Sequence, residues 1–186
     1  PVVRLAHVRP PVAWLAHDVV VRADRLRVFR WCRPALARVI AVSAAVADRL
    51  RSTGVRIDVV HNGVPWPVEP ASSAPAGPPV VGISALLTPW KGHHVLLDAV
   101  PMLDDEVSVE IMGGHLVTDT DFAASIRARC SEPALRDRVR VLGHVADPLA
   151  RMRSWTVAVS ASVAPEACPL NVLEAMSLGV PVVATD

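Results

Sequence analysis

The stretch VVGISALLTPWKGHHVLLDAV, residues 80–100, decides the predicted fold. It begins with a short, largely β-branched apolar run that is typical of a buried strand, at residues 80–84. A loop follows, and the apolar spacing of residues 92–100 then predicts a helix. The rest of the chain repeats this strand–loop–helix unit.

The alternation of strand and helix extends in both directions from this stretch. Because strands that alternate with helices indicate βαβ units, we predict an α/β fold with parallel, doubly wound sheets. Serine is a preferred helix-capping residue, so Ser43 predicts a helix that starts at residue 44. Further strands are predicted at residues 39–42, 57–60, 107–112, 139–142, 157–160 and 180–184, and further helices at 44–51, 121–130, 149–153 and 171–178.

Residues 65–79 interrupt this alternation. They hold six of the 17 prolines, together with alanine, serine and glycine, and they show no apolar period. Such a composition predicts a linker. We therefore divide the chain into an incomplete first domain at residues 1–64, a linker at residues 65–78 and a second domain at residues 79–186.

The composition suits sheets that are covered on both faces, with 52% hydrophobic and 20% charged residues. No apolar run approaches the roughly 18 residues of a membrane span. Cys32, Cys130 and Cys168 are widely spaced and odd in number, which predicts neither a disulfide framework nor a zinc site. We expect a cytoplasmic protein. The absence of an initiator methionine indicates a fragment.

Charge is distributed unevenly along the chain. Residues 1–56 carry eleven arginines against three aspartates, a net charge of +8, whereas the remainder carries −7. The arginines at positions 22, 25, 27, 30, 33 and 38 would give a helix a basic face for anionic lipids at the inner face of a membrane, or for an acidic partner. A solvated arginine-rich surface explains the same pattern. Nucleic acid is not an expected partner.

The loop after the strand at residues 80–84 is the first candidate site, because ligands of open parallel sheets bind beyond the carboxyl ends of the strands. Lys91 is the only lysine in the sequence, and Gly92 follows it at the start of a helix. A point charge, free helix amides and a glycine that allows close approach favour phosphate binding. The alternative is an ordinary surface lysine.

A second candidate loop spans residues 165–176. Glu166 lies in the loop, and Glu174 lies one turn into the next helix. Carboxylates can accept two hydrogen bonds from a sugar or ribose diol, although such pairs are usually solvated. Asn171 either contacts a ligand or caps the helix. A metal site is not expected, because the histidines lack the spacing of a helical zinc pair.

The order of the segments resembles glycosyltransferase family 4, the retaining enzymes of the GT-B fold with two Rossmann-like domains. The resemblance covers nearly the whole chain from about residue 16. It is carried by VIAVSAAVADRL (residues 39–50), VVHNGV (59–64), TPWKG (88–92), VLGHV (141–145), the two glutamates at 166 and 174, and GVPVVATD (179–186).

The resemblance implies a nucleotide-diphosphate sugar as donor and no metal or other cofactor. Residues 79–186 would bind the donor, and residues 1–64 would be part of the acceptor-side domain, with the acceptor unknown. Lys91 would neutralise the diphosphate as a catalytic residue beside Gly92, and Glu174 would bind the ribose. Two further catalytic residues are implied: Glu166 would contact the transferred sugar, and His17, after an apolar strand, would lie near sugar and acceptor. The nucleobase wall would be Gly143, His144 and Val145, with phosphate amides near Leu170 and Asn171.

Two departures from the family pattern weaken the expected donor site. Leu86 stands where the family usually has an arginine, which removes one charged contact worth about 1.5–3 kcal/mol. Cys168-Pro169 replaces the common Phe-Gly, and the proline lacks an amide donor.

Other functions remain open at this point. A non-catalytic nucleotide-sugar-binding protein or subunit fits the two departures, and a sugar-nucleotide epimerase of the same fold fits the resemblance. The family's glycine-rich loop would precede Pro1 and its last helices would follow Asp186, so this segment alone is expected to bind donor poorly and to turn over nothing.

Overall fold

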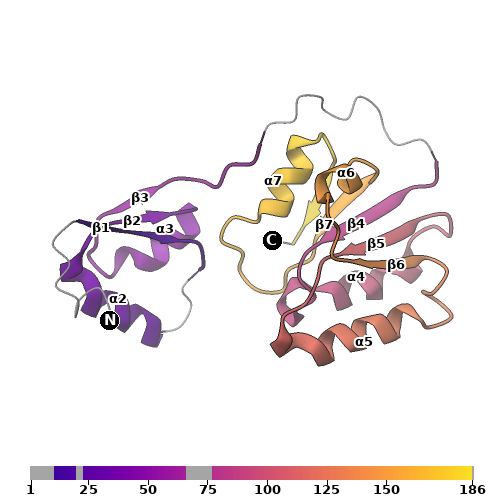
Figure 1. Ribbon diagram of the computed structural model, residues 1–186, viewed down its shortest axis with the longest axis horizontal. Coiled ribbons are helices and arrows are strands. Elements are labelled where there is room, and N and C mark those ends of the chain that lie inside the picture. Colours follow the sequence, from indigo (N-terminus) through magenta and orange to yellow (C-terminus); the bar gives the residue numbers. More distant parts are fainter. Residues whose placement is uncertain (1–10, 20–22, 66–76, 186) are drawn as a thin grey trace. The chain divides into compact units, whose positions relative to one another are not determined.

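The computed structural model describes residues 11–19, 23–65 and 77–185 (Figure 1). These residues form two compact units. The first contains the chain up to Gly63 together with Pro165–Pro169, and the second contains the chain from Val64 to Ala164 and from Leu170 onward. Most of the predicted linker, residues 66–76, lies outside the described residues.

The first unit is built on a three-stranded parallel sheet in the order β1-β2-β3. The prediction of a helix at residues 44–51 is confirmed, because the hydroxyl group of Ser43 accepts the backbone N–H of Val46 at 3.3 Å. The arginine-rich segment also forms a helix, which is shorter than the run of arginines. The elements are β1 (Val12–Ala16), α2 (Ala23–Cys32), η1 (Arg33–Ala35), β2 (Leu36–Ala41), α3 (Ala44–Arg51) and β3 (Ile57–Val59).

The second unit is built on a five-stranded parallel sheet in the order β6-β5-β4-β7-β8. The chain therefore starts at the centre of the sheet, moves out to one edge, returns and fills the other side. This order is that of a doubly wound nucleotide-binding fold. The strands are β4 (Val80–Ser84), β5 (Ser108–Met112), β6 (Val139–Gly143), β7 (Val157–Ser160) and β8 (Val182–Ala184).

Helices cover both faces of this sheet, with α4 and α5 on one face and α6 and α7 on the other (Figure 1). The predicted elements are all present, and their ends shift by at most two residues, except that β2, predicted to begin at Val39, begins three residues earlier at Leu36. The last strand, predicted to begin at Val180, begins at Val182, since the Val180 N–H donates back to Ala175 in α7. The helices are α4 (His93–Ala99), α5 (Thr120–Cys130), α6 (Pro148–Met152) and α7 (Leu170–Ser177), with 3-10 turns η2 (Pro89–Lys91), η3 (Val100–Met102) and η4 (Val117–Asp119).

Side chains along β5 alternate between the two cores of the second unit. Val109 and Ile111 pack under α4 and α5, whereas Met112 belongs to the cluster under α6 and α7. In that second cluster the ring of Trp155 lies over Gly82, where an added methyl carbon would come within 1.9 Å of the ring. Gly82 is therefore required for the packing of the largest buried side chain.

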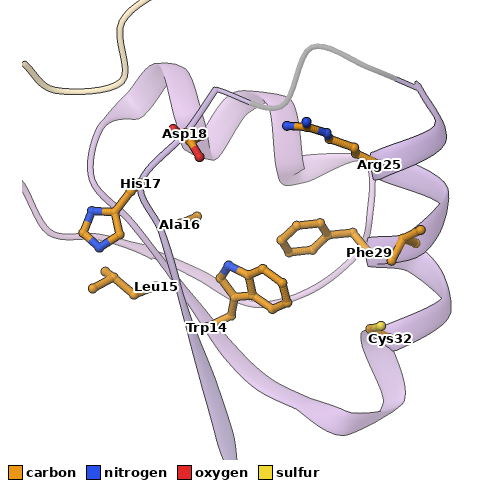
Figure 2. A pocket seen from close by; sticks show the side chains of 9 residues that line it. Trp14, Leu15, Ala16, His17, Asp18, Arg25, Phe29 and Cys32 are labelled. Atoms are coloured by element: carbon orange, nitrogen blue, oxygen red, sulfur yellow. The ribbon is translucent and has the colours of Figure 1, made fainter. Parts of the chain in front are cut away.

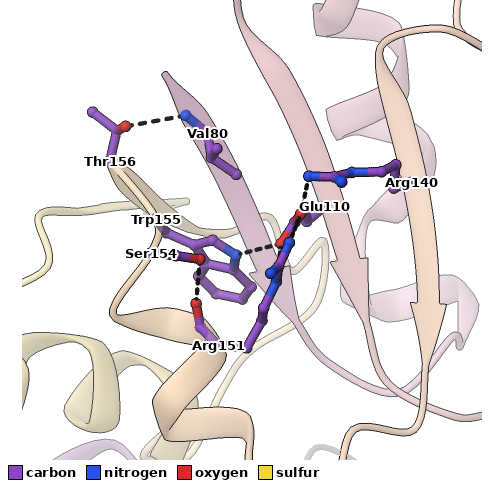
Figure 3. Close-up of polar contacts among 7 residues, drawn as sticks. All are labelled: Val80, Glu110, Arg140, Arg151, Ser154, Trp155 and Thr156. Atoms are coloured by element: carbon purple, nitrogen blue, oxygen red, sulfur yellow. Dashed lines mark hydrogen bonds and ion pairs between the residues drawn. The ribbon is translucent and has the colours of Figure 1, made fainter. Parts of the chain in front are cut away.

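Glu110 is a fully buried carboxylate in the middle of β5 (Figure 3). It accepts hydrogen bonds from Trp155 Nε1 at 3.0 Å, from Arg151 Nε at 2.6 Å and from Arg140 at 2.5 Å. Burial alone would raise the pKa of Glu110, but the hydrogen bonds from Arg151 and Trp155 and the two arginine charges hold it below its ordinary value. A charged network thus ties α6 to the sheet.

Replacement of Arg151 by methionine should destabilise the protein, because the Glu110 carboxylate would lose its bidentate partner while staying buried. We expect the free energy of unfolding to fall by about 3 kcal/mol, the low end for such a loss, since Arg140 remains. Urea denaturation followed by tryptophan fluorescence measures it. Arg136→Met, at an exposed site, is the control and should change stability by less than about 0.5 kcal/mol. Equal stability of both variants would contradict the role of the network.

His93 is the first residue of α4 and is fully buried. Neither ring nitrogen has a partner in hydrogen-bonding geometry among the described residues. The pKa of His93 is lowered from 6.5 to about 4, chiefly by burial and to a smaller extent by the charges of His94 and Lys91, while the backbone of Ala85 offsets a part. His93 is therefore neutral at physiological pH.

The stability of the protein should depend on pH through His93. Between pH 6.5 and pH 4 the unfolded chain binds a proton that the folded chain excludes, so the free energy of unfolding falls as pH falls, by about 3 kcal/mol. Urea denaturation across this range should show a shallower pH dependence in His93→Leu than in the wild type. His115→Leu, at an exposed position, is the control and should keep the wild-type dependence of stability on pH. An unchanged pH dependence in His93→Leu would refute the assignment of this effect to His93.

Candidate functional site

The candidate site lies where the order of the second sheet reverses, between the adjacent strands β4 and β7. The helices that follow these strands, α4 and α7, cover opposite faces of the sheet. The two connecting loops, residues 85–92 and 161–169, therefore part from each other at the carboxyl edge. Ligands of doubly wound sheets bind at this topological switch point.

Backbone hydrogen bonds link the loops along this edge. The Leu87 N–H donates to Gly114 O at 2.7 Å, and the Gly113 N–H donates to Gly143 O at 2.8 Å. These bonds join the loops that follow β4, β5 and β6. Across the switch point the Val163 N–H donates to Trp90 O at 2.8 Å. The loop that carries Lys91 is thus fixed on both sides.

Gly92 is required at its position for two reasons. Its φ angle of 70° lies in the left-handed region, which other residues rarely adopt. A methyl carbon added there would also lie 1.7 Å from the carbonyl oxygen of Ala161. The backbone at Gly92 therefore meets the loop after β7 with no space for a side chain.

Lys91 ends the η2 turn and is half-buried, with its ammonium group 4.0 Å from the centre of the Trp90 ring. It is the only lysine of the sequence. The loops that follow β4, β5, β6 and β7 are described in full, and within them no arginine and no other lysine occurs. Permanent positive charge at this edge is therefore concentrated in one group, which suits phosphate oxygens.

The other predicted donor residues of the second unit lie on α7 and on the end of β6. Asn171 and Glu174 are half-buried in the first turns of α7, after the exposed Leu170. Gly143 ends β6 with a φ angle of 67°. His144, exposed, and Val145, packed against the core under α6 and α7, follow it.

Glu166 belongs to a segment that the structure groups with the first unit. Ala167 and Cys168 pack against the core of that unit, and Asn62 Nδ2 donates to Cys168 O at 3.0 Å. Glu166 itself is half-buried. The second candidate loop is thus shared: residues 165–169 join the first unit, and Leu170 begins a helix of the second.

His17 also lies in the first unit, at the carboxyl end of β1. It is exposed and borders a pocket of about 390 Å³ (Figure 2). Apolar side chains line most of this pocket, and Trp14 and Phe29 face each other in it at a ring distance of 4.9 Å. Its other lining residues are Leu15, Ala16, Asp18, Arg25, Val28 and Cys32.

The structure therefore places Lys91, Gly92 and residues 143–145 on linked loops of one edge, with Asn171 and Glu174 on a helix of the same unit. Sequence reasoning missed Trp90, Ala161 and the glycine pair at 113–114. The glycine pair directly after a strand was a usable signal, since Gly113 would otherwise clash with Ala85 O. The contacts of Trp90 and Ala161 have no signature along the chain.

Two further properties concern the described part of the chain. None of its helices is both long enough and apolar enough to cross a membrane. Within the same residues, no group of three or more histidine, cysteine, aspartate or glutamate side chains is arranged to hold a metal ion.

Comparison with known proteins identifies the family of this chain. The model of the family "Glycosyl transferases group 1" matches residues 78–186. The phosphatidyl-myo-inositol mannosyltransferase of Mycobacterium leprae (strain TN) is 30% identical to this chain over an alignment of 193 residues. The alignment covers 95% of this chain and 49% of that relative. The chain thus spans about half the length of this curated relative.

Solved structures agree with the family model. HepE of Anabaena, crystallised with UDP and glucose, superposes with a TM-score of 0.82 at 27% identity, over 95% of this chain and 53% of HepE. A TarM variant of S. aureus superposes with a TM-score of 0.78 over 97% of this chain and 38% of TarM, and at 22% identity it shows the fold alone. The predicted α/β fold class with two parallel sheets, that of GT-B glycosyltransferases, is confirmed. Because the family model covers more than half of the sequence, this chain belongs to the glycosyl transferases group 1 family.

Proposed function

We propose that this chain is part of a retaining glycosyltransferase of family 4, which transfers a sugar from a nucleotide-diphosphate sugar to a glycan, lipid or small-molecule acceptor. The observation that carries the proposal is Lys91, a single cation on a glycine-anchored loop at the β4–β7 switch point. The UDP and glucose in the HepE crystals support this donor class. The name of the mycobacterial relative, a mannosyltransferase, supports sugar transfer.

In this proposal the second unit binds the donor. Lys91 and the backbone at Gly92 receive the diphosphate, and the amides near Leu170 and Asn171 receive it from the start of α7. Glu174 accepts hydrogen bonds from the ribose hydroxyl groups. Residues 143–145, at the glycine-ended strand β6, form the wall of the nucleobase pocket.

The first unit contributes the acceptor side and the sugar contacts. Glu166 binds hydroxyl groups of the transferred sugar, and His17 lies near sugar and acceptor. The nucleoside diphosphate leaves while the sugar takes on oxocarbenium character, and the acceptor attacks from the same face. The charge that grows on the leaving diphosphate is met by Lys91 and by helix amides, and the proposed mechanism uses no metal ion.

Lys91→Ala and Glu174→Ala should each weaken binding of the nucleoside diphosphate to the full-length protein. Loss of one charged hydrogen bond corresponds to about 10–150-fold in affinity. Calorimetry with UDP, GDP and ADP identifies the ligand of the wild type and measures the variants. The exposed Arg136→Ala and Glu132→Ala serve as controls and should bind as the wild type does. Unchanged affinity in both site variants would refute the donor site.

A non-catalytic nucleotide-sugar-binding protein is the second candidate, and two residues favour it. Leu86 stands where the family has an arginine, and no arginine occurs elsewhere in the loops after β4 to β7. Pro169 removes an amide donor just before α7. Transfer of sugar by the full-length protein, followed by product analysis, would exclude this candidate.

We also propose that the first unit contacts anionic membranes through α2. Arg25, Arg27 and Arg30 are exposed on this helix, and Val28 and Trp31 of the same helix are exposed at 44% and 42%. Arginines attract anionic headgroups, and apolar and indole side chains favour the interface. Such contact suits a transferase with a lipid acceptor at the inner face of the membrane.

The double variant Arg27→Gln/Arg30→Gln should bind anionic vesicles less well than the wild type. Each basic residue near the surface contributes about 1 kcal/mol, so the loss is about 30-fold in partitioning. Sedimentation with phosphatidylglycerol–phosphatidylcholine vesicles at low and high salt measures it. Arg127→Gln/Arg136→Gln is the control and should sediment as the wild type does. A bound fraction that is insensitive to salt and to the first pair would contradict the proposal.

A further inference from the structure

Trp90 is a large aromatic side chain that stays 41% exposed directly beside the proposed phosphate site. The Lys91 ammonium group lies 4.0 Å from the centre of its ring, well within the range of a cation–π interaction. The tryptophan belongs to neither hydrophobic core of the second unit. Its side chain therefore lies outside the two cores, and it contacts the Lys91 cation.

The backbone under this pair is fixed. The Lys91 N–H donates to Thr88 O at 3.2 Å, which closes the η2 turn, and Pro89 restricts that turn further. Trp90 O accepts the Val163 N–H at 2.8 Å, so the indole leaves the chain from a point tied to the loop after β7. The backbone from which the indole extends is consequently fixed, and the four-carbon side chain of a lysine is intrinsically flexible.

This arrangement matters because Lys91 is the only lysine or arginine of the loops that follow β4 to β7. Leu86, at the position of the family's arginine, is 45% exposed and supplies no charge. A ligand held by one flexible ammonium group must order that side chain when it binds, and preorganisation removes part of this cost. The contact of the ammonium group with the Trp90 ring, at 4.0 Å from the ring centre, restricts the orientation of that group before a ligand binds.

We propose that Trp90 is a positioning residue, which holds the Lys91 ammonium group by a cation–π contact in the orientation that receives the diphosphate. The proposal rests on the proposed function of this site. Trp90 acts through Lys91 and contacts no reacting atom. It compensates in part for the missing arginine at position 86.

The test is a double-mutant cycle on nucleotide affinity in the full-length protein. Calorimetry uses whichever of UDP, GDP and ADP binds the wild type. Trp90→Leu should weaken binding about fivefold, and Trp90→Phe, which keeps a π face, should remain within about twofold of the wild type. In the Lys91→Ala background Trp90→Leu should have no further effect. Trp31→Leu, which replaces an equally exposed tryptophan, is the control and should bind as the wild type does.

The outcomes separate this inference from the proposed function. Unchanged affinity in Lys91→Ala would refute the phosphate site itself. Two outcomes would refute the role of Trp90 alone, provided that Lys91→Ala lowers the affinity. In the first, Trp90→Leu keeps the wild-type affinity. In the second, the effects of the two substitutions on the binding free energy simply add. If thermal unfolding shows that Trp90→Leu is misfolded, Trp90→Phe and Trp90→Met replace it in the cycle. Their affinities are then measured in the wild-type and Lys91→Ala backgrounds and are judged by the same two outcomes.

Discussion

The contact between the backbone of Gly92 and the carbonyl group of Ala161 is the constraint on which the proposed site depends. The loops after β4 and β7 lead to helices on opposite faces of the sheet, so they contact each other over only a few residues at its edge before they diverge. With no side chain between them they approach closely enough for the Trp90–Val163 hydrogen bond to form. Any larger residue would separate the loops and displace Lys91. The position of the Lys91 ammonium group therefore depends on the absence of a side chain at Gly92.

The interior of the sheet supports this edge by a different kind of interaction. Glu110 is buried beside Trp155, and its pairing with Arg151 anchors α6 over the strands. Helix α6 contacts α7, the helix that presents Asn171 and Glu174. A buried carboxylate is costly unless it is fully paired, so this network favours one position of α6 over others. The position of the proposed ribose contact therefore depends on a carboxylate that is buried within the sheet.

Much of the fold could be predicted because its elements follow local rules. The strands at residues 80–84 and 157–160 have the predicted bounds, since strands covered on both faces form continuous apolar runs, and Ser43 marks the start of α3. Helix α2 has arginines among its apolar residues and no clear period, so its ends could not be predicted. The candidate loops were predictable from their place after strands. The hydrogen bond between Trp90 and Val163 and the burial of Glu110 and His93 depend on contacts between distant parts of the chain, which no pattern along the chain records.

The single lysine gives this segment an uncommon chemical property. Reagents that acylate primary amines have one side-chain target between residues 1 and 186, and that target is half-buried at the proposed phosphate site. All other cationic side chains are arginine or histidine, which such reagents leave largely intact. Modification at this position would convert the ammonium group into a neutral amide and remove the only lysine or arginine charge of the four loops. Because every other permanently charged basic side chain is arginine, the one nucleophilic side-chain amine of the segment lies at the proposed phosphate site.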